Sequence, residues 1–303
     1  MWIAGRPWSL RIEDGKVAAR GAPAGDRLLL PAFIDAHVHL AVAGEVQGEL
    51  VRNGVAAVLD LGAPLASLPF AASPLRIVYS GPMLTAPRGY PTQSWGANGF
   101  GAQLASERDA REAVARVADA GARFVKLAFD PRYPLLDAAV ARAAAEEAHR
   151  RGLLVAAHAL EADSVRRALD AGCDVLGHTP REELPEELLR RLRGRWVIST
   201  LRAFGVDPSR LRALHEAGMR VAYGTDLGNE GTAPRIEERE LELLLHAGVD
   251  PLQAATSAAA ELLGLARPAL VEGSEASLLV VRDQSPAGLA NPEQVYNRGT
   301  LVS

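Results

Sequence analysis

The chain has 303 residues, of which 48% are hydrophobic and 23% are charged, a composition typical of a globular protein with a substantial core. Its net charge of -4 and its pI of about 6.0 argue against a nucleic-acid partner or an anionic membrane surface. Cys173 is the only cysteine, which excludes an intrachain disulfide framework and suits a reducing compartment.

The first residues, Met1 to Arg6, lack the basic-then-apolar pattern of a signal peptide, and no run of about 18 apolar residues is present to span a membrane. We therefore expect a cytoplasmic protein that acts on a small molecule. Neither a nucleic acid nor a membrane is expected as a partner, and a homo-oligomer is left open.

Both ends of the chain are predicted to form short β-strands. The apolar segments are residues 8–12, 17–19, 28–30, 278–281 and 300–302. Glu13-Asp14-Gly15-Lys16, between the first two, is typical of a hairpin turn. Because strands from opposite ends of a chain can pair, the sequence predicts a small satellite β domain of residues 1–30 plus 266–303, beside a main domain of residues 31–265.

In the main domain, short apolar runs alternate with alanine-rich, charged stretches of helical period. The predicted strands are residues 33–38, 55–61, 76–80, 124–129, 153–158, 175–178, 196–200 and 221–225. The predicted helices are residues 107–120, 137–151, 161–171, 182–192, 209–217, 234–247 and 251–263. Eight strands alternating with helices over about 230 residues are typical of a (β/α)₈ barrel of the triosephosphate-isomerase type.

A doubly wound open sheet is the alternative fold. Such a sheet usually carries a glycine-rich phosphate turn after its first strand, and here that place holds His37-Val38-His39. The segment from residue 81 to residue 106 follows strand three and is rich in proline, glycine and aromatic residues. A long loop at the C-terminal face of a barrel is more often functional than not, so we expect it to border the active site.

Six potential metal ligands are predicted to lie at or near the carboxyl ends of five different strands. They are His37, His39, Lys126, His158, His178 and Asp226. Side chains two residues apart on a strand share a face, so both His37 and His39 are expected to point into the barrel mouth. Catalytic residues of such barrels come from the ends of several strands. The joint arrangement is a far stronger signal than any one of these residues. His149, His215 and His246, on predicted helices, are expected to be surface or helix-packing residues.

The residue types suit a site for two divalent cations. Imidazole and carboxylate ligands favour Zn²⁺, with Mn²⁺, Co²⁺ or Fe²⁺ as alternatives. His37, His39 and Asp226 could hold one ion, and His158 and His178 the other. Lys126 is one of only two lysines in the chain. A buried lysine can lose its proton, react with carbon dioxide and form a carbamate, which would bridge the ions together with a hydroxide.

These motifs resemble the amidohydrolase superfamily, within its imidazolonepropionase- and prolidase-like branch. The segment from Pro31 to Leu40, Pro-Ala-Phe-Ile-Asp-Ala-His-Val-His-Leu, is similar to the strand-one signature of that family. Thr225-Asp226, the segment Ala254 to Gly264 and the return from Gly273 to Val281 are similar to its closing regions. The resemblance implies a binuclear site with carbamylated Lys126. It also implies that Asp226 is both a ligand and the proton shuttle.

The substrate side of the site is less defined by the sequence. Relatives often carry Gly-Gly-His in the loop after strand three, where this chain has Arg88-Gly89-Tyr90. Tyr90 could polarise a carbonyl group opposite the metals, and Arg88 or Arg202 could hold a substrate carboxylate. Trp95 and Tyr133 are expected to line the pocket or to pack the loop.

The resulting hypothesis is a metal-dependent hydrolase that cleaves the amide bond of a cyclic amide, an N-acyl amino acid or a dipeptide-like molecule. A metal-bridging hydroxide would attack the carbonyl carbon. A second hypothesis keeps the site but changes the bond to that of a lactone, an ester, a phosphotriester or the amidine of a deaminase substrate. A third is a barrel without catalytic activity that serves as a scaffold; such a protein would be expected to have lost ligands, and here all six positions are filled.

Overall fold

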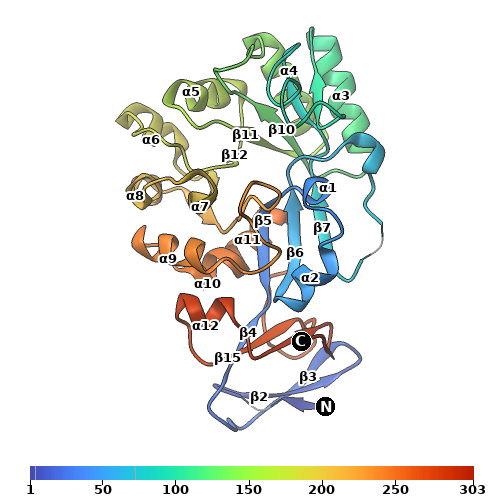
Figure 1. The fold of residues 1–303 in the computed structure, drawn as a ribbon, viewed down its shortest axis with the longest axis vertical. Helices are drawn as coiled ribbons and strands as arrows, with labels where there is room; N and C mark the ends of the chain where they lie inside the picture. The colour runs from blue at the N-terminus through green and yellow to red at the C-terminus, as the bar shows by residue number, and fades with distance from the viewer. Residues whose placement is uncertain (4, 72) are drawn as a thin grey trace.

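The computed structural model describes residues 1–3, 5–71 and 73–303, and its main part is a (β/α)₈ barrel (Figure 1). The barrel strands are β5 (Phe33–Val38), β6 (Val55–Asp60), β7 (Arg76–Tyr79) with β8 (Met83–Thr85), β10 (Phe124–Ala128), β11 (Leu154–His158), β12 (Val175–Leu176), β13 (Trp196–Ile198) and β14 (Arg220–Ala222). Paired neighbours run parallel, as in the register that sets Lys126 opposite Ala156. The predicted fold class and strand order are confirmed.

Backbone hydrogen bonds between irregular segments close the barrel. The three-stranded sheet β5–β6–β7 and the sheet that runs from β8 to β14 meet at two seams. At one, the Arg123 N–H donates to the Tyr79 carbonyl oxygen at 3.1 Å. At the other, the Ala36 N–H donates to the Tyr223 carbonyl and the Asp226 N–H to the His37 carbonyl, both at 2.9 Å. This second seam places Asp226 beside the end of strand one.

Strand three differs from its prediction because it is broken. Gly81, with φ of +73°, separates β7 from β8, and β8 continues the barrel by pairing with β10. β9 (Gly101–Gln103) then pairs with β8 as a further parallel strand. The expectation of irregular loop throughout residues 81–106 is therefore wrong at its two ends. The connection from β8 to β9 is the part that stands above the barrel.

Helices surround the barrel. They are α1 (Leu40–Ala43), α2 (Gln47–Arg52), the 3₁₀ turn η1 (Leu65–Ser67), α3 (Glu107–Asp119), α4 (Ala138–Arg150), α5 (Ala162–Ala171), α6 (Glu186–Leu192), α7 (Leu201–Phe204), α8 (Pro208–Glu216), α9 (Glu238–His246), α10 (Pro251–Gln253), the π-helical turn η2 (Ala254–Ala258), α11 (Ala259–Leu263) and α12 (Pro286–Ala290). The predicted helix 182–192 begins only at Glu186, because Pro185 disfavours a helical conformation for the residues before it. None of the described helices has the length and apolar character needed to cross a membrane.

The predicted helix 251–263 is interrupted by the π-helical turn η2. The carbonyl oxygen of Ala254 accepts a hydrogen bond from the N–H of Tyr223, at the end of strand eight. A carbonyl group that bonds to a neighbouring strand favours such a local widening of a helix. The turn therefore links the last helix of the barrel to its last strand.

The two chain ends form the predicted small β structure. β4 (Leu28–Pro31) pairs antiparallel with β15 (Leu278–Val281), which continues to β16 (Gln294–Asn297) and β17 (Thr300–Leu301). A second sheet holds β1 (Trp2–Ile3), β2 (Ser9–Glu13) and β3 (Lys16–Gly21). Asp14 and Gly15 both have positive φ, as a two-residue hairpin turn requires. Both sheets lie at one end of the molecule, beyond α12 (Figure 1).

The core explains why the barrel strands are so apolar. All six residues of β5 and all five of β10 are buried, because barrel strands face helices on one side and the barrel interior on the other. The lower interior is filled by residues such as Ile34, Leu59, Phe124 and Ile198. The six predicted ligands lie at the opposite end, where the strands finish.

Candidate active site

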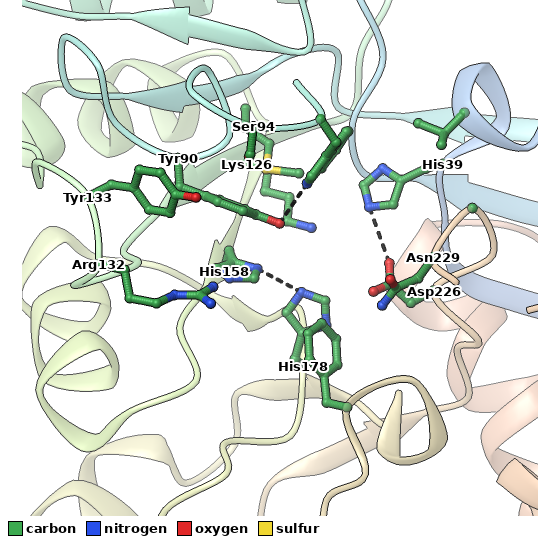
Figure 2. Close-up of a pocket in the computed structure, with 15 residues that line it drawn as sticks. His39, Tyr90, Ser94, Lys126, Arg132, Tyr133, His158, His178, Asp226 and Asn229 are labelled. Carbon is green, nitrogen blue, oxygen red and sulfur yellow. Dashed lines mark hydrogen bonds and ion pairs between the residues drawn. The ribbon is translucent and has the colours of Figure 1, made fainter. Parts of the chain in front are cut away.

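All six predicted ligands lie at the carboxyl ends of barrel strands. His37 and Lys126 lie on β5 and β10, His158 ends β11, and His39, His178 and Asp226 lie just beyond β5, β12 and β14. Each is at most 6% exposed. Figure 2 shows five of them facing one cavity, and the sixth, His37, stacks on His178 with a ring-centroid distance of 4.5 Å. The structure therefore brings together residues that are up to 189 positions apart in the chain (37 to 226).

His37, His39 and Asp226 form one compact group. The Nε2 atoms of His37 and His39 lie 3.3 and 3.2 Å from the same oxygen, Oδ1 of Asp226. This buried oxygen has no hydrogen-bond partner among the described residues. Two ring nitrogens and a carboxylate oxygen that lie within 4.8 Å of one another are arranged as the ligands of a metal ion are.

The backbone at Asp226 is held in an unusual conformation. Its φ of +56° lies in the left-handed region, which costs a residue with a side chain about 1–3 kcal/mol. Thr200, which follows strand seven, also has a positive φ, of +41°. Its Oγ1 lies 3.1 Å from Nδ1 of His178. Such conformations concentrate at functional sites, and here both bear on proposed ligands.

Lys126 lies between the two histidine groups. Its Nζ is 2.9 Å from Nε2 of His37, and the whole side chain is buried. Burial lowers the pKa of Lys126 to about 8, although the charges of Asp226 and Asp60 oppose this shift. A large fraction of such amines is neutral near pH 8, so Lys126 is more nucleophilic than an exposed lysine.

His158 and His178 form the second group. Nδ1 of His158 faces Nε2 of His178 at 3.0 Å. Burial and the nearby charge of Lys126 lower the pKa of His158 to about 3, and burial lowers the pKa of His178 well below its ordinary value. Both rings are therefore neutral at physiological pH, which is the form that binds metal.

Backbone carbonyl groups orient the rings of the first group. Nδ1 of His37 lies 2.7 Å from the Gly177 oxygen, and Nδ1 of His39 lies 3.4 Å from the Gly62 oxygen. Donation from Nδ1–H of His37 leaves Nε2 unprotonated toward the site. A Cβ atom on Gly62 would lie 2.8 Å from the His39 ring, so glycine is required there for the ring to fit.

Two buried carboxylates that the sequence did not single out hold the loops carrying these ligands. Asp35 accepts hydrogen bonds from the His37 N–H at 3.0 Å and from the N–H and Oγ1 of Thr225 at 3.1 and 2.5 Å. Asp60 accepts from the Leu40 N–H at 2.8 Å and the Gly62 N–H at 3.0 Å. Asp35 is the third residue of β5 and Asp60 is the last residue of β6. A charged residue in an apolar strand is noticeable in the sequence, but it does not indicate which backbone groups it holds.

The cavity above the ligands has a volume of about 350 Å³. The part of its wall that does not consist of proposed ligands is formed by Val42, Met83, Tyr90, Ser94, Trp95, Arg132, Tyr133, Phe204, Gly228 and Asn229. Tyr90, Trp95 and Tyr133 were expected there from the sequence. Arg132, Phe204 and Asn229 were not.

Tyr90 is a polar residue of the wall that contacts the second histidine pair. Its ring stacks on His158 with a centroid distance of 4.7 Å, and its hydroxyl oxygen accepts a hydrogen bond from Nε1 of Trp95 at 2.9 Å (Figure 2). Burial raises the pKa of Tyr90 to about 12. The hydroxyl therefore keeps its proton, and it can donate that proton to a bound molecule.

Arg88 and Arg202, the two arginines proposed to hold a carboxylate, are not among the described residues that line the cavity. Arg88 is exposed, and its backbone N–H donates to Gln103. Arg202 donates to the Gly231 carbonyl oxygen at 2.7 Å and pairs with Glu237 at 3.4 Å. The arginine that does reach the cavity is Arg132.

Comparisons with solved structures agree with the fold. A proposed prolidase from Bifidobacterium longum is 26% identical, with a TM-score of 0.77 over 97% of this chain and 89% of that one. A Xaa-Pro dipeptidase solved with methionine in its active site is 19% identical, with a TM-score of 0.79 over 97% and 94%. Ochratoxinase of A. niger is 18% identical, with a TM-score of 0.76 over 98% and 92%. No curated protein matches the sequence.

The family comparison covers almost the entire chain. A model described as the amidohydrolase family matches residues 28–302, which include β4, the whole barrel and the last sheet. The resemblance to prolidase-like amidohydrolases that the sequence suggested is confirmed. The chain belongs to the amidohydrolase family.

Proposed function

We propose that this hydrolase cleaves an amide bond of a small molecule at a site for two divalent cations. The observation that carries the proposal is the convergence of six buried ligand-type side chains at one end of the barrel, below a cavity of about 350 Å³. Amidohydrolases generally use divalent cations, and the groups present here fit them. Oδ1 of Asp226 is a buried oxygen without a partner, and a cation shared with the Nε2 atoms of His37 and His39 would satisfy it.

The second ion would be held by His158 and His178, whose facing ring nitrogens are 3.0 Å apart. Lys126, whose Nζ is 2.9 Å from Nε2 of His37, would supply the ligand shared by the two ions. Its ammonium group first loses a proton; the neutral amine then forms an N–C bond with carbon dioxide and releases a second proton to solvent, which leaves a carboxylate-like group on Nζ. That modification converts a cation into an anion, and it removes the charge repulsion that an ammonium group would exert on two metal ions.

When bound, the two cations supply Lewis acidity toward a carbonyl oxygen and lower the pKa of water at the site. Asp226 is positioned to transfer the proton of the attacking water. Burial alone would raise the pKa of Asp226, but His37, His39 and Lys126 hold it below its ordinary value. The carboxylate is therefore ionised, and it can take a proton from the attacking water and pass it to the amide nitrogen that leaves.

Tyr90 would stabilise the developing negative charge on the carbonyl oxygen. Because Trp95 donates to its oxygen, the hydroxyl proton of Tyr90 is left for the substrate. A hydrogen bond that strengthens as charge develops contributes to catalysis more than one that is equal in the ground state. The cavity, with a volume of about 350 Å³, has room for a small molecule. We propose an N-acyl amino acid, a dipeptide-like molecule or a cyclic amide as the substrate.

The chain has only one lysine besides Lys126, and this is Lys16, which is exposed on β3. Lys16 therefore serves as the control in a test for the carbamate. Protein produced with ¹³C-labelled bicarbonate is analysed by ¹³C NMR for a carbamate resonance and by mass spectrometry for bound metals. We expect one carbamate and about two ions per chain. Lys126→Ala should lose the carbamate, at least one ion and amide hydrolysis, whereas Lys16→Ala should keep all three.

Normal turnover in Lys126→Ala, or a carbamate that disappears in Lys16→Ala instead, would contradict the assignment of the bridging residue. A panel of amides, lactones, esters, phosphotriesters and amidines separates the proposed reaction from the others that the same groups could perform. Hydrolysis of a lactone or phosphotriester with no activity on amides would reject the amide assignment and leave the metal site intact.

A further inference from the structure

The wall of the cavity carries one cationic side chain besides Lys126 among its described residues, and this is Arg132. It lies on the connection that follows β10. Figure 2 shows its guanidinium group beside His158, on the side of the cavity away from His39 and Asp226. No step of the proposed hydrolysis uses Arg132.

Asp130 fixes the position of Arg132. This carboxylate is 4% exposed and accepts from Nε of Arg132 at 3.0 Å and from Nη2 at 2.6 Å. It also accepts from the backbone N–H of Arg132 at 3.0 Å. Burial would raise the pKa of Asp130, but the hydrogen bonds from Arg132 keep it below its ordinary value, so the pair is ionic. A two-point contact of this kind restricts a long side chain to one orientation.

The pairing leaves part of the guanidinium group available. Asp130 occupies the edge formed by Nε and Nη2, whereas Nη1 has no acceptor among the described residues. The side chain of Arg132 remains 67% exposed. A guanidinium group offers five N–H donors on a planar fork, and its Nη1–Nη2 edge can form a second two-point contact with a carboxylate.

Another part of the cavity wall is apolar. Val42 and Trp95 are apolar side chains of the wall that are 43% and 40% exposed, and Phe204 and Met83 continue the apolar surface inward. A ligand that matches this wall combines an apolar part with a single anionic group at the Arg132 side. The amide bond of such a ligand would lie between its apolar part and its anionic group, above the histidine rings.

We propose that Arg132 binds a free carboxylate of the substrate and that Asp130 is the positioning residue for it. This inference rests on the proposed amide hydrolysis and narrows its substrate class. It selects N-acyl amino acids and dipeptides, which carry a carboxylate a few bonds from the amide, over cyclic amides that lack one. Arg132 therefore has the carboxylate-binding role that was predicted for Arg88 or Arg202.

The test measures binding to the metal-loaded enzyme without turnover. The two probes are N-methylsulfonyl-L-phenylalanine and N-methylsulfonyl-phenethylamine, which has hydrogen in place of the carboxylate. Neither contains a carboxamide that the enzyme could cleave. Isothermal titration calorimetry gives the ratio of the two dissociation constants, and we expect the carboxylated probe to bind about tenfold more tightly, since a charge-assisted pair at an exposed group has this order of effect.

Arg132→Ala should remove the preference, so that both probes bind with the affinity of the neutral one. Arg132→Lys, which keeps the charge but loses the two-point geometry, should retain part of it. Asp130→Asn should also reduce the ratio, a readout that a purely structural role would not change because misfolded protein affects both probes equally. Arg142→Ala removes the same charge from the exposed face of α4 and should leave the ratio unchanged.

Equal affinities of the two probes for the wild-type enzyme, or no binding of either, would overturn the proposal. So would an undiminished preference in Arg132→Ala. The same experiments distinguish a failure of the proposed hydrolysis from a failure of the carboxylate site. If the enzyme cleaves no amide but still prefers the carboxylated probe, and this preference depends on Arg132, the proposed reaction is refuted and the carboxylate site is retained.

Discussion

A buried carboxyl group outside the proposed metal site, that of Glu240, makes the stability of this protein depend on pH, and its surroundings set the direction of that dependence. Glu240 lies on α9 and is fully buried. Its oxygens accept from the Leu201 N–H at 3.0 Å and from the Arg202 N–H at 2.8 Å, at the start of α7. Burial nevertheless raises the pKa of Glu240 from 4.5 to about 7.

This rise in pKa sets both the sign and the size of the effect. Between pH 4.5 and pH 7 the unfolded chain has lost the Glu240 proton while the folded chain still holds it, so unfolding releases a proton. The free energy of unfolding therefore falls as the pH rises from 4.5 to 7. Above pH 7 the contribution of Glu240 no longer changes with pH. With 1.36 kcal/mol for each pKa unit, the loss amounts to about 3 kcal/mol.

The variant Glu240→Gln has no titrating group at this position. It can accept only one of the two N–H groups well, which costs about 1–3 kcal/mol at every pH. The free energy of unfolding of Glu240→Gln minus that of the wild type should therefore increase by about 3 kcal/mol between pH 4.5 and pH 7.

Urea denaturation followed by circular dichroism at several pH values measures the difference directly. Glu216→Gln, at an exposed position of α8, is the matched control and should show no such trend. A difference between the wild type and Glu240→Gln that stays constant across the range would refute the reasoning.

Three further predictions concern the rest of the molecule. Burial raises the pKa of the Cys173 thiol, so it should react with thiol reagents only after unfolding, and rapid labelling of the native protein would contradict the structure. Tyr90→Phe should lower kcat about 100-fold or more with unchanged metal content, as measured by steady-state kinetics; an unchanged kcat would remove Tyr90 from the mechanism. Removal of metal by a chelator should lower the melting temperature and Zn²⁺ should restore it, since a cation at 100 times its Kd adds about 2.7 kcal/mol. An identical melting temperature without metal would argue against bound cations in the folded protein.

The barrel and the ligand-type residues were accessible from the sequence because both follow from short-range patterns. Short runs such as Phe124 to Ala128, apolar except for Lys126, are typical of strands that are buried on both sides, and in a barrel the residues at the strand ends lie close together. Strand three was harder. Gly81 bends the chain within one barrel position, and no periodicity distinguishes a bent strand from a strand followed by a loop.

Groups that act through hydrogen bonds over long sequence separations could not be predicted. Asp35 holds Thr225 across 190 positions, and Glu240 holds Leu201 across 39. A buried carboxylate on a strand or helix has no sequence pattern that names its partner. The same limitation applies to Arg132, because the sequence offers 31 arginines (33 basic residues less two lysines) and only the folded loops show which one reaches the cavity.

The two parts of the site differ in how they are held, and this difference explains why the chemistry was easier to infer than the substrate. The proposed ligands are buried at strand ends, and backbone carbonyls or buried carboxylates fix them, so their geometry belongs to the barrel itself. Tyr90, Trp95 and Arg132 lie on connections between strands, and the contacts that orient them are made within those connections. A loop can exchange such residues without disturbing the strands. Selection for a new substrate can therefore act on Arg132 and its partner Asp130 while the proposed ligands beneath them stay the same.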